Sequence, residues 1–193
     1  MLRNALIVIL LTVVFVGSLQ AEIPTQSRLL FHGTKELTDN WGVAGWLIFP
    51  NIVSGNTNLI IAGPRYNFNK GWVEFLGGQL IKADESSTVW NIRASSEHLL
   101  IHFWGEVEYF SQDDKLYWFL QANYPISLKE TFIGKPGIET ENVHQKDESS
   151  QIGFGPHVIL PVSQNMTLII AHQWKYTANE WDRFYRFYIV FDL

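Results

Sequence analysis

From residue 41 to the last residue, apolar and polar positions alternate with a period of two. Runs rich in Val, Ile, Tyr, Phe and Trp are separated by short clusters of Gly, Asn, Asp, Ser and Pro. This pattern is typical of β-strands joined by hairpin turns, because successive side chains of a strand point to opposite faces. Helical spacing of apolar residues is not sustained anywhere in this region. The pattern predicts ten strands, at residues 41–50, 57–68, 72–83, 87–95, 99–110, 115–124, 130–139, 150–160, 166–177 and 182–193.

The short connections predict that neighbouring strands are antiparallel. Strands that follow one another in this way form a meander, which either closes into a barrel or folds into a sandwich. We predict an all-β fold, a closed antiparallel up-and-down β-barrel of about ten strands, with eight or twelve strands as alternatives. Closure would pair the final strand on both sides and leave no apolar edge open to aggregation.

The faces of the expected strands favour a barrel in lipid. In one strand, Phe103 and Val107 share an apolar face, while His102, Glu106 and Glu108 share the opposite face. A water-soluble barrel has the reverse arrangement, with its apolar face inside. The polar faces carry too little charge for a solvated exterior, but they suit a narrow interior. The pattern therefore predicts a transmembrane β-barrel with a polar lumen.

The connections alternate between two rims. The longest, the acidic ETENVHQKDESS at 139–150, falls on the same rim as VSGN, ADESS, SQDDK and ANEWD. Longer loops on one rim and shorter turns on the other are typical of outer-membrane barrels. With an even number of strands, both termini are expected at the periplasmic rim.

Residues 1–21 have the layout of a secretory signal peptide. A positive charge at Arg3 precedes an apolar run from Ala5 to Val16, and small and polar residues follow. The alternative, an uncleaved membrane anchor, needs about 20 apolar residues, and the run is shorter than that. We expect cleavage near Ala21.

Two further segments follow the signal peptide. Residues 22–40 are expected to form an N-terminal periplasmic lead-in or a plug, and residues 41–193 the β-barrel domain. The stretch RLLF within the first segment is also compatible with an extra strand, which would give eleven strands and break the even number.

The closing stretch YRFYIVFDL resembles the C-terminal β-signal of bacterial outer-membrane β-barrel proteins. Alternate positions are apolar in both, although the last residue is Leu where that superfamily usually has Phe or Trp. The resemblance implies a location in the outer membrane of a Gram-negative bacterium, contact with outer-membrane lipid, and recognition of the last strand by the barrel-assembly machinery. The matching residues are Tyr185, Phe187, Ile189, Phe191 and Leu193.

Composition narrows the possible functions. The net charge of −5 argues against nucleic acid as a partner. The absence of cysteine from the sequence excludes disulfides, thiolate metal sites and a cysteine nucleophile. Aromatic residues make up 15% of the chain, with eight Trp, as in barrels that carry aromatic girdles at the membrane interfaces.

A set of polar residues is predicted to face the lumen. These residues could line a polar path for a solute, but an interior salt-bridge lattice fits better because side chains fill small barrels. A two-residue turn at Asn69–Lys70 would place Arg65 opposite Glu74, whereas a three-residue turn ending at Gly71 would shift that register. The predicted lumen set is Arg65, Glu74, Arg93, His102, Glu106, Glu108, Gln121, Lys175 and Arg186.

Sequence motifs for catalysis or metal binding are weak. His102 and Glu106 share a face, but four residues along a strand separate them by about 13 Å, too far for a shared ligand. Ser95, Ser96 and His98 fit turn chemistry on the periplasmic side. We therefore predict no catalytic residue, no metal site and no cofactor.

These features favour an integral outer-membrane barrel, porin-like in location, with a structural, surface-interaction or small-solute passage role. Its acidic outer loops offer a surface for a partner or a divalent cation. One alternative is an outer-membrane hydrolase acting on lipid or peptide, which requires a nucleophile and a base within hydrogen-bond reach at the outer rim. Another is a soluble periplasmic lipocalin-like binding barrel, which requires Phe103, Trp118, Phe154 and Phe187 to point inward.

Overall fold

The computed structural model describes residues 25–52, 57–83, 85–128 and 131–193, so the expected signal peptide at 1–21 lies outside the described residues. No helix in this part of the chain is long and apolar enough to cross a membrane. The strands are β1 (Thr25–Glu36), β2 (Trp41–Phe49), β3 (Thr57–Phe68), β4 (Gly71–Lys82), β5 (Ser86–His98), β6 (Ile101–Phe110), β7 (Lys115–Asn123), β8 (Ile126–Leu128), β9 (Thr131–Gln145), β10 (Gln151–Pro161), β11 (Met166–Thr177) and β12 (Glu180–Asp192).

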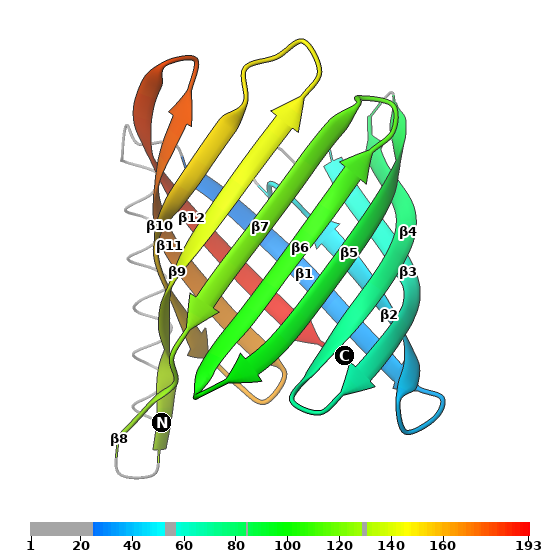
Figure 1. Cartoon of the computed structure of the whole chain (residues 1–193), viewed down its shortest axis with the longest axis vertical. Coiled ribbons are helices and arrows are strands. Elements are labelled where there is room, and N and C mark those ends of the chain that lie inside the picture. The colour runs from blue at the N-terminus through cyan, green and yellow to red at the C-terminus, as the bar shows by residue number, and fades with distance from the viewer. Residues whose placement is uncertain (1–24, 53–56, 84, 129–130) are drawn as a thin grey trace.

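Eleven of these strands close into a tilted β-barrel (Figure 1). Each strand pairs with the next along the chain, except that β7 pairs with β9, and β12 returns to pair with β1. The short β8 pairs with β9 alone and lies outside the ring. The protein is therefore an all-β closed barrel of eleven strands with one additional short strand.

The expected count of ten strands is wrong by one. Residues 25–36, which we expected in a lead-in or plug, form β1 and complete the ring between β2 and β12. The uniformly antiparallel arrangement is also wrong at one contact, since β1 and β12 are parallel. The physical reason is parity: consecutive antiparallel strands alternate in direction, so the first and last of an odd number run the same way.

The β1–β12 contact, hereafter the seam, pairs the final strand on both sides. Its register runs from Thr25 opposite Tyr185 to His32 opposite Asp192. On the outer face, the rings of Phe31 and Phe191 stack with their centroids 5.2 Å apart. The seam thus replaces the open edge that a terminal strand would otherwise have.

The two rims of the barrel carry different sets of connections. Strands β2, β4, β6, β9 and β11 end at one rim, which we call the long-loop rim, at the top of Figure 1. Both β1 and β12 run toward the opposite, short-turn rim. Strand β12 ends at the short-turn rim, whereas β1 begins farther toward the long-loop rim (Figure 1). The prediction that both termini share a rim assumed an even number of strands, and the N-terminal end of the chain lies outside the described residues.

The ten predicted strands are present, with two changes at their ends. Strand β5 extends to His98, so its turn to β6 is Leu99–Leu100, two exposed residues with φ of 48° and 70°. Pairing of Ser96 with both Gly71 and Phe103 keeps β5 extended past the expected turn. Strand β9 continues to Gln145, through residues that we assigned to the acidic loop.

Side chains alternate between the interior and the outer surface, and the alternation in burial is clearest in the central strands. In β5, for example, the burial pattern alternates from Ser87 to Ser95 between buried and less buried positions. Apolar side chains fill part of the interior, mainly under β2 to β5. The rest of the interior is polar, and it holds the candidate site.

Candidate functional site

Ten ionisable side chains on the inward faces of the strands form what we call the charged lattice. Their exposed fractions range from 0% for Glu74 and Glu139 to 20% for Lys175. Five are carboxylates and five are cations, so their formal charges cancel. The members are Glu74, Glu106, Glu108, Glu139, Glu141, Arg28, Arg65, Arg93, Lys175 and Arg186.

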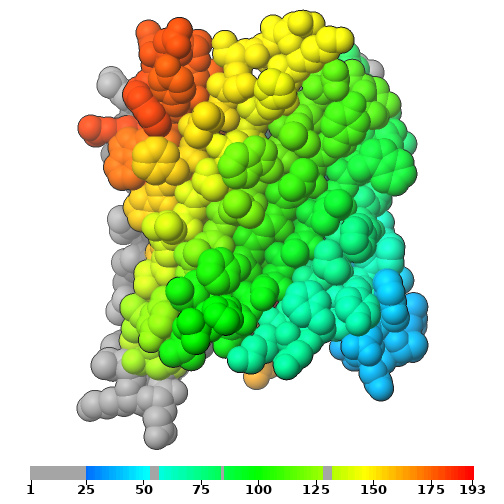
Figure 2. All heavy atoms as spheres, in the orientation of Figure 1, coloured from blue at the N-terminus to red at the C-terminus, as the bar shows by residue number. Residues whose placement is uncertain are grey.

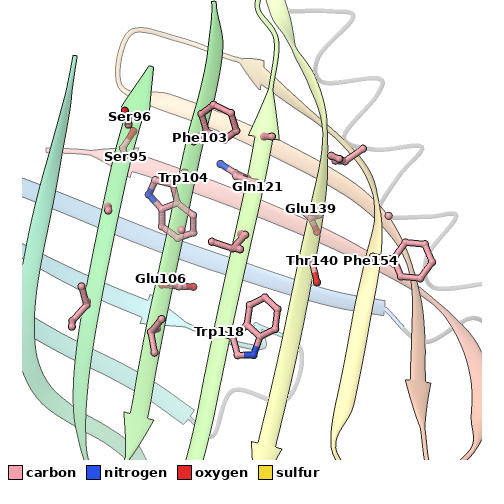
Figure 3. Close-up of a pocket in the computed structure, with 18 of the residues that line it drawn as sticks. Ser95, Ser96, Phe103, Trp104, Glu106, Trp118, Gln121, Glu139, Thr140 and Phe154 are labelled. Carbon is pink, nitrogen blue, oxygen red and sulfur yellow. The ribbon is translucent and has the colours of Figure 1, made fainter. Parts of the chain in front are cut away.

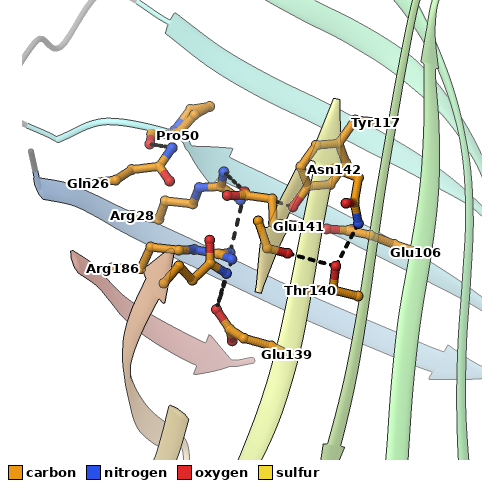
Figure 4. Close-up of polar contacts among 12 residues, drawn as sticks. Gln26, Arg28, Pro50, Glu106, Tyr117, Glu139, Thr140, Glu141, Asn142 and Arg186 are labelled. Carbon is orange, nitrogen blue, oxygen red and sulfur yellow. Dashed lines mark hydrogen bonds and ion pairs between the residues drawn. The ribbon is translucent and has the colours of Figure 1, made fainter. Parts of the chain in front are cut away.

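Glu141 on β9 is the most highly connected member. Its carboxylate oxygens lie 2.9 Å from Arg28 Nη2, 2.9 Å from Lys175 Nζ and 3.6 Å from Arg186 Nη2. The Tyr117 hydroxyl donates a further hydrogen bond of 3.1 Å. Figure 4 shows the side chains of Arg28 and Arg186 reaching from β1 and β12 toward β9. Glu141 therefore links the seam to the opposite wall of the barrel.

Glu139, two residues earlier on the same face of β9, makes a second group of contacts. Arg186 Nη1 donates to its Oε1 over 2.9 Å, and Gln173 Nε2 donates to the same oxygen over 2.6 Å. The His157 Nδ1 atom lies 3.5 Å from Oε2, and the His157 side chain is fully buried. Arg186 thus lies between two carboxylates of one strand.

A second cluster surrounds Arg93 on β5. One of its nitrogens, Nη2, lies 2.8 Å from Glu106 Oε2 and 3.2 Å from Glu108 Oε1, both on the neighbouring β6. Asn91 Nδ2 also donates to Glu108 Oε1, over 2.8 Å. The Arg93 guanidinium carbon lies 4.3 Å from the ring centroid of Trp46, a cation–π contact.

Trp46 connects this cluster to a third one around Glu74. Its indole Nε1 donates to Glu74 Oε2 over 2.9 Å, while Arg65 Nη1 donates to Oε1 over the same distance. The His32 ring stacks on Trp46 with centroids 4.0 Å apart. Arg65 and Glu74 are direct cross-strand partners, as the two-residue turn predicts, and Lys70 in that turn has a φ of 68°.

Each carboxylate of the lattice lies against at least one cation. Removal of charges from water costs several kcal/mol per ion, and close, hydrogen-bonded counter-charges offset this cost. A buried cation that lost its carboxylate would carry an uncompensated desolvation cost. The ion pairs therefore hold strands that are distant in sequence in fixed positions relative to one another. The arrangement also leaves little free space around the charges, since most of these side chains are almost fully buried.

All nine residues of the predicted lumen set lie on the inward side of their strands. The structure brings Arg65 to Glu74, Arg93 to Glu106 and Glu108, and Lys175 and Arg186 to Glu141. His102 and Gln121 belong to the same inward faces but make no ion pair within the described part of the chain.

His102 lies near Ser95 instead. The Ser95 Oγ and His102 Nε2 atoms are 3.3 Å apart. Ser95 is buried, and the pair lies toward the short-turn rim rather than the long-loop rim. Within the described residues His102 has no hydrogen bond to a carboxylate that would orient it as a general base.

Sequence reasoning missed Arg28, Glu139 and Glu141. Arg28 lies in the segment assigned to a lead-in. Glu139 is both the last residue of the expected strand 130–139 and the first of the expected acidic loop, and Glu141 lies within that loop. A signal for Glu141 was present, since Glu139, Glu141 and Val143 continue the period of two past the expected end of the strand. Their acidic character led us to assign them to a solvated loop.

The outer surface carries the aromatic residues of the predicted apolar faces. Phe103, Trp118 and Phe154 are all well exposed there. Phe187 lies on the opposite face of β12 from the buried Arg186, as does the rest of the β-signal set. No group of three or more His, Cys, Asp or Glu side chains that could hold a metal ion occurs within the described residues.

Comparison with known proteins gives no guide to function, because no family model, no curated protein and no solved structure matches this chain. The distribution of polarity across the barrel wall is therefore the basis for a functional conclusion. The interior combines the charged lattice with an apolar cluster, while large apolar side chains are exposed on the outside, around one continuous ring of strands.

Proposed function

We propose that the protein is an integral β-barrel of the bacterial outer membrane, with a structural or surface-interaction role. The observation that carries this proposal is the inverted polarity of the wall. Ile92 and Val107 are 49% and 46% exposed on the outside, while Arg93 and Glu106, their neighbours along the same strands, are buried inside. In water this arrangement would expose the apolar outer surface to solvent while the charges are buried. In lipid the apolar outer face contacts hydrocarbon and the charged side chains pair with one another in the lumen.

Two features of the sequence support the location. The first 21 residues have the layout of a signal peptide, and the last strand resembles the outer-membrane β-signal. The β-signal residues Phe187, Ile189 and Phe191 share the outer face of β12 with the rest of the apolar surface.

The packed interior favours a structural role over passage of a small solute. Within the charged lattice, the contacts of Glu139 and Glu141 span the lumen from β9 to β1 and β12, and the clusters around Glu74 and Arg93 fill the space beside β3 to β6. Exposed acidic side chains gather on the long-loop rim, where Asp147, Glu148 and Glu180 offer a surface for a partner or a divalent cation. Surface interaction at this rim is the role that the geometry supports best.

The two alternatives have less support. A lipocalin-like soluble barrel requires inward aromatic residues at positions where the side chains of Phe103, Trp118 and Phe154 are exposed. A hydrolase could use Ser95 as nucleophile and His102 as base, since the two side chains are in contact. The Ser95 hydroxyl is buried, however, and no carboxylate among the described residues orients the His102 imidazole, so the pair is poorly suited to nucleophilic catalysis.

Gel mobility of the folded protein tests the membrane location. Outer-membrane fractions washed with alkaline carbonate should retain the protein, and unboiled samples should migrate differently from boiled ones, because a closed barrel resists unfolding in detergent. Release of the protein into the wash would contradict the proposal and would favour a soluble barrel.

Electrical recording tests the closed interior. Purified protein in a planar lipid bilayer is expected to give no stepwise conductance, because the charged lattice occupies the lumen. A general porin reconstituted in the same way serves as the positive control. Stable single-channel steps from this chain would restore the solute-passage role while leaving the membrane location intact.

A further inference from the structure

A well-defined hollow of the molecule lies on the outer wall and not in the lumen. It has a volume of about 1020 Å³ and extends over the outer faces of β5, β6, β7, β9 and β10. Figure 2 presents this wall to the viewer, and Figure 3 shows the rings of Phe103, Trp118 and Phe154 around the hollow. We call it the outer groove.

Small outward-facing residues create the outer groove. Ala94 and Gly105 are direct partners across β5 and β6, and Ala122 on β7 lies opposite Phe103. These three positions carry little or no side chain between larger neighbours. A Cβ atom at Gly105 would lie 2.6 Å from Cδ2 of Leu120, so the glycine lets the Leu120 side chain lie close against β6, and a larger residue at this position would push Leu120 outward into the groove.

The chemistry of the outer groove is almost entirely apolar. The Thr140 hydroxyl, one of the polar groups that line it, already donates to Gly153 O over 2.7 Å and accepts from Asn142 Nδ2 over 2.8 Å. The charges of Glu106 and Glu139 behind the wall are held by Arg93 and Arg186 in the interior. An occupant therefore gains mainly apolar burial here and meets few polar groups.

We infer that the outer groove seats a hydrocarbon tail of a membrane lipid. The inference rests on the proposed function, because the groove is continuous with the exposed apolar surface that would face the bilayer. Around it, Leu120 and Ile138 are 54% and 69% exposed. A concave, apolar site of this size, open along the wall, suits a flexible unbranched chain, whereas the polar headgroup remains at the rim.

Photochemical labelling in vesicles tests this inference. The full chain is reconstituted in phosphatidylcholine vesicles that contain a phosphatidylcholine with a diazirine on its acyl chain, and labelled peptides are mapped by mass spectrometry. Labelling of β6 and β7 is expected to exceed that of the outer face of β2 and β3 several-fold. Variants Gly105→Leu and Ala122→Trp fill the groove and should remove this excess.

Gly45→Leu is the matched control, because Gly45 also faces outward and has open space around it, with its nearest neighbours 3.9 Å away. The boiling-dependent gel shift shows whether each variant folds. If one of the two groove-filling variants does not fold, the other still tests the inference. Uniform labelling of an inserted wild-type barrel would contradict the inference that the groove binds a lipid tail. Cross-links between two chains through β6 and β7 would also contradict it, because a second copy of the chain would then cover the groove. Failure of the protein to float with the vesicles would instead overturn the proposed function.

Discussion

The Glu141→Gln variant is expected to lose about 3–5 kcal/mol of unfolding free energy, the usual cost when one partner of a buried ion pair is removed. Arg28, Lys175 and Arg186 all approach this carboxylate, and a neutral amide leaves their charges under-compensated in the barrel interior. Arg186 keeps Glu139 as a partner, so Arg28 and Lys175 should account for most of the loss.

Denaturant unfolding of the barrel in phosphatidylcholine vesicles, followed by tryptophan fluorescence, measures this effect. The midpoint should fall while the dependence on denaturant stays constant, because the surface exposed on unfolding is unchanged. Glu180→Gln is the control: it removes the same charge from an exposed position, and none of the ion pairs found among the described residues involves Glu180. Equal midpoints for the two variants would contradict the central place of Glu141.

A double variant separates the charge effect from a general packing defect. Adding Lys175→Met to Glu141→Gln removes one of the under-compensated cations and is expected to recover part of the lost stability. A simple sum of the two single effects would indicate that Lys175 and Glu141 do not interact energetically, despite the 2.9 Å between their charged atoms.

Ile92→Arg should destabilise the barrel in lipid by about 2–4 kcal/mol, the cost of an arginine on the lipid face near the middle of the bilayer. Ile92 lies halfway along β5 and is exposed, with Phe75 and Val107 as its outward neighbours. In a water-soluble barrel, an exposed arginine at this position would change stability by no more than about 0.5 kcal/mol. The two environments therefore predict different results for one substitution.

The same vesicle assay measures the Ile92→Arg effect. Leu37→Arg is the matched control, since Leu37 is an exposed apolar residue in the turn after β1 and lies at the short-turn rim. A strong loss for Ile92→Arg with little change for Leu37→Arg would support lipid around the middle of the wall. Little change in both variants would count against the membrane proposal.

The strands that the sequence predicted well are those whose two faces differ clearly. Period-two alternation is a local property, and it located ten strands to within a few residues at most ends. Strand β1 was not predicted, because Leu29 and Leu30 are adjacent apolar residues on opposite faces and therefore interrupt the alternation of apolar and polar positions. The C-terminal end of β9 was not predicted because buried carboxylates resemble those of an acidic loop until their counter-charges are known.

The charged lattice illustrates what alternation cannot provide. The Arg28–Glu141 contact joins residues 113 positions apart, and the Arg186–Glu139 contact joins residues 47 apart. Arg65 and Glu74 are nine positions apart across a short turn, and their pairing was one of the two registers that the sequence allowed for that turn. Within one hairpin the sequence thus narrows the possible partners, whereas it does not indicate the partners that meet only when the ring closes.

The sequence by itself determined that the chain is built of β-strands, and it determined which side chains share a face, because successive residues of a strand necessarily point to opposite sides. The tertiary structure alone decided the number of strands in the ring, the parallel seam and the partners of the buried charges. These depend on which distant strands meet when the ring closes, and on the cost of leaving an inward charge without its counter-charge. Both are properties of the closed barrel and of no single segment.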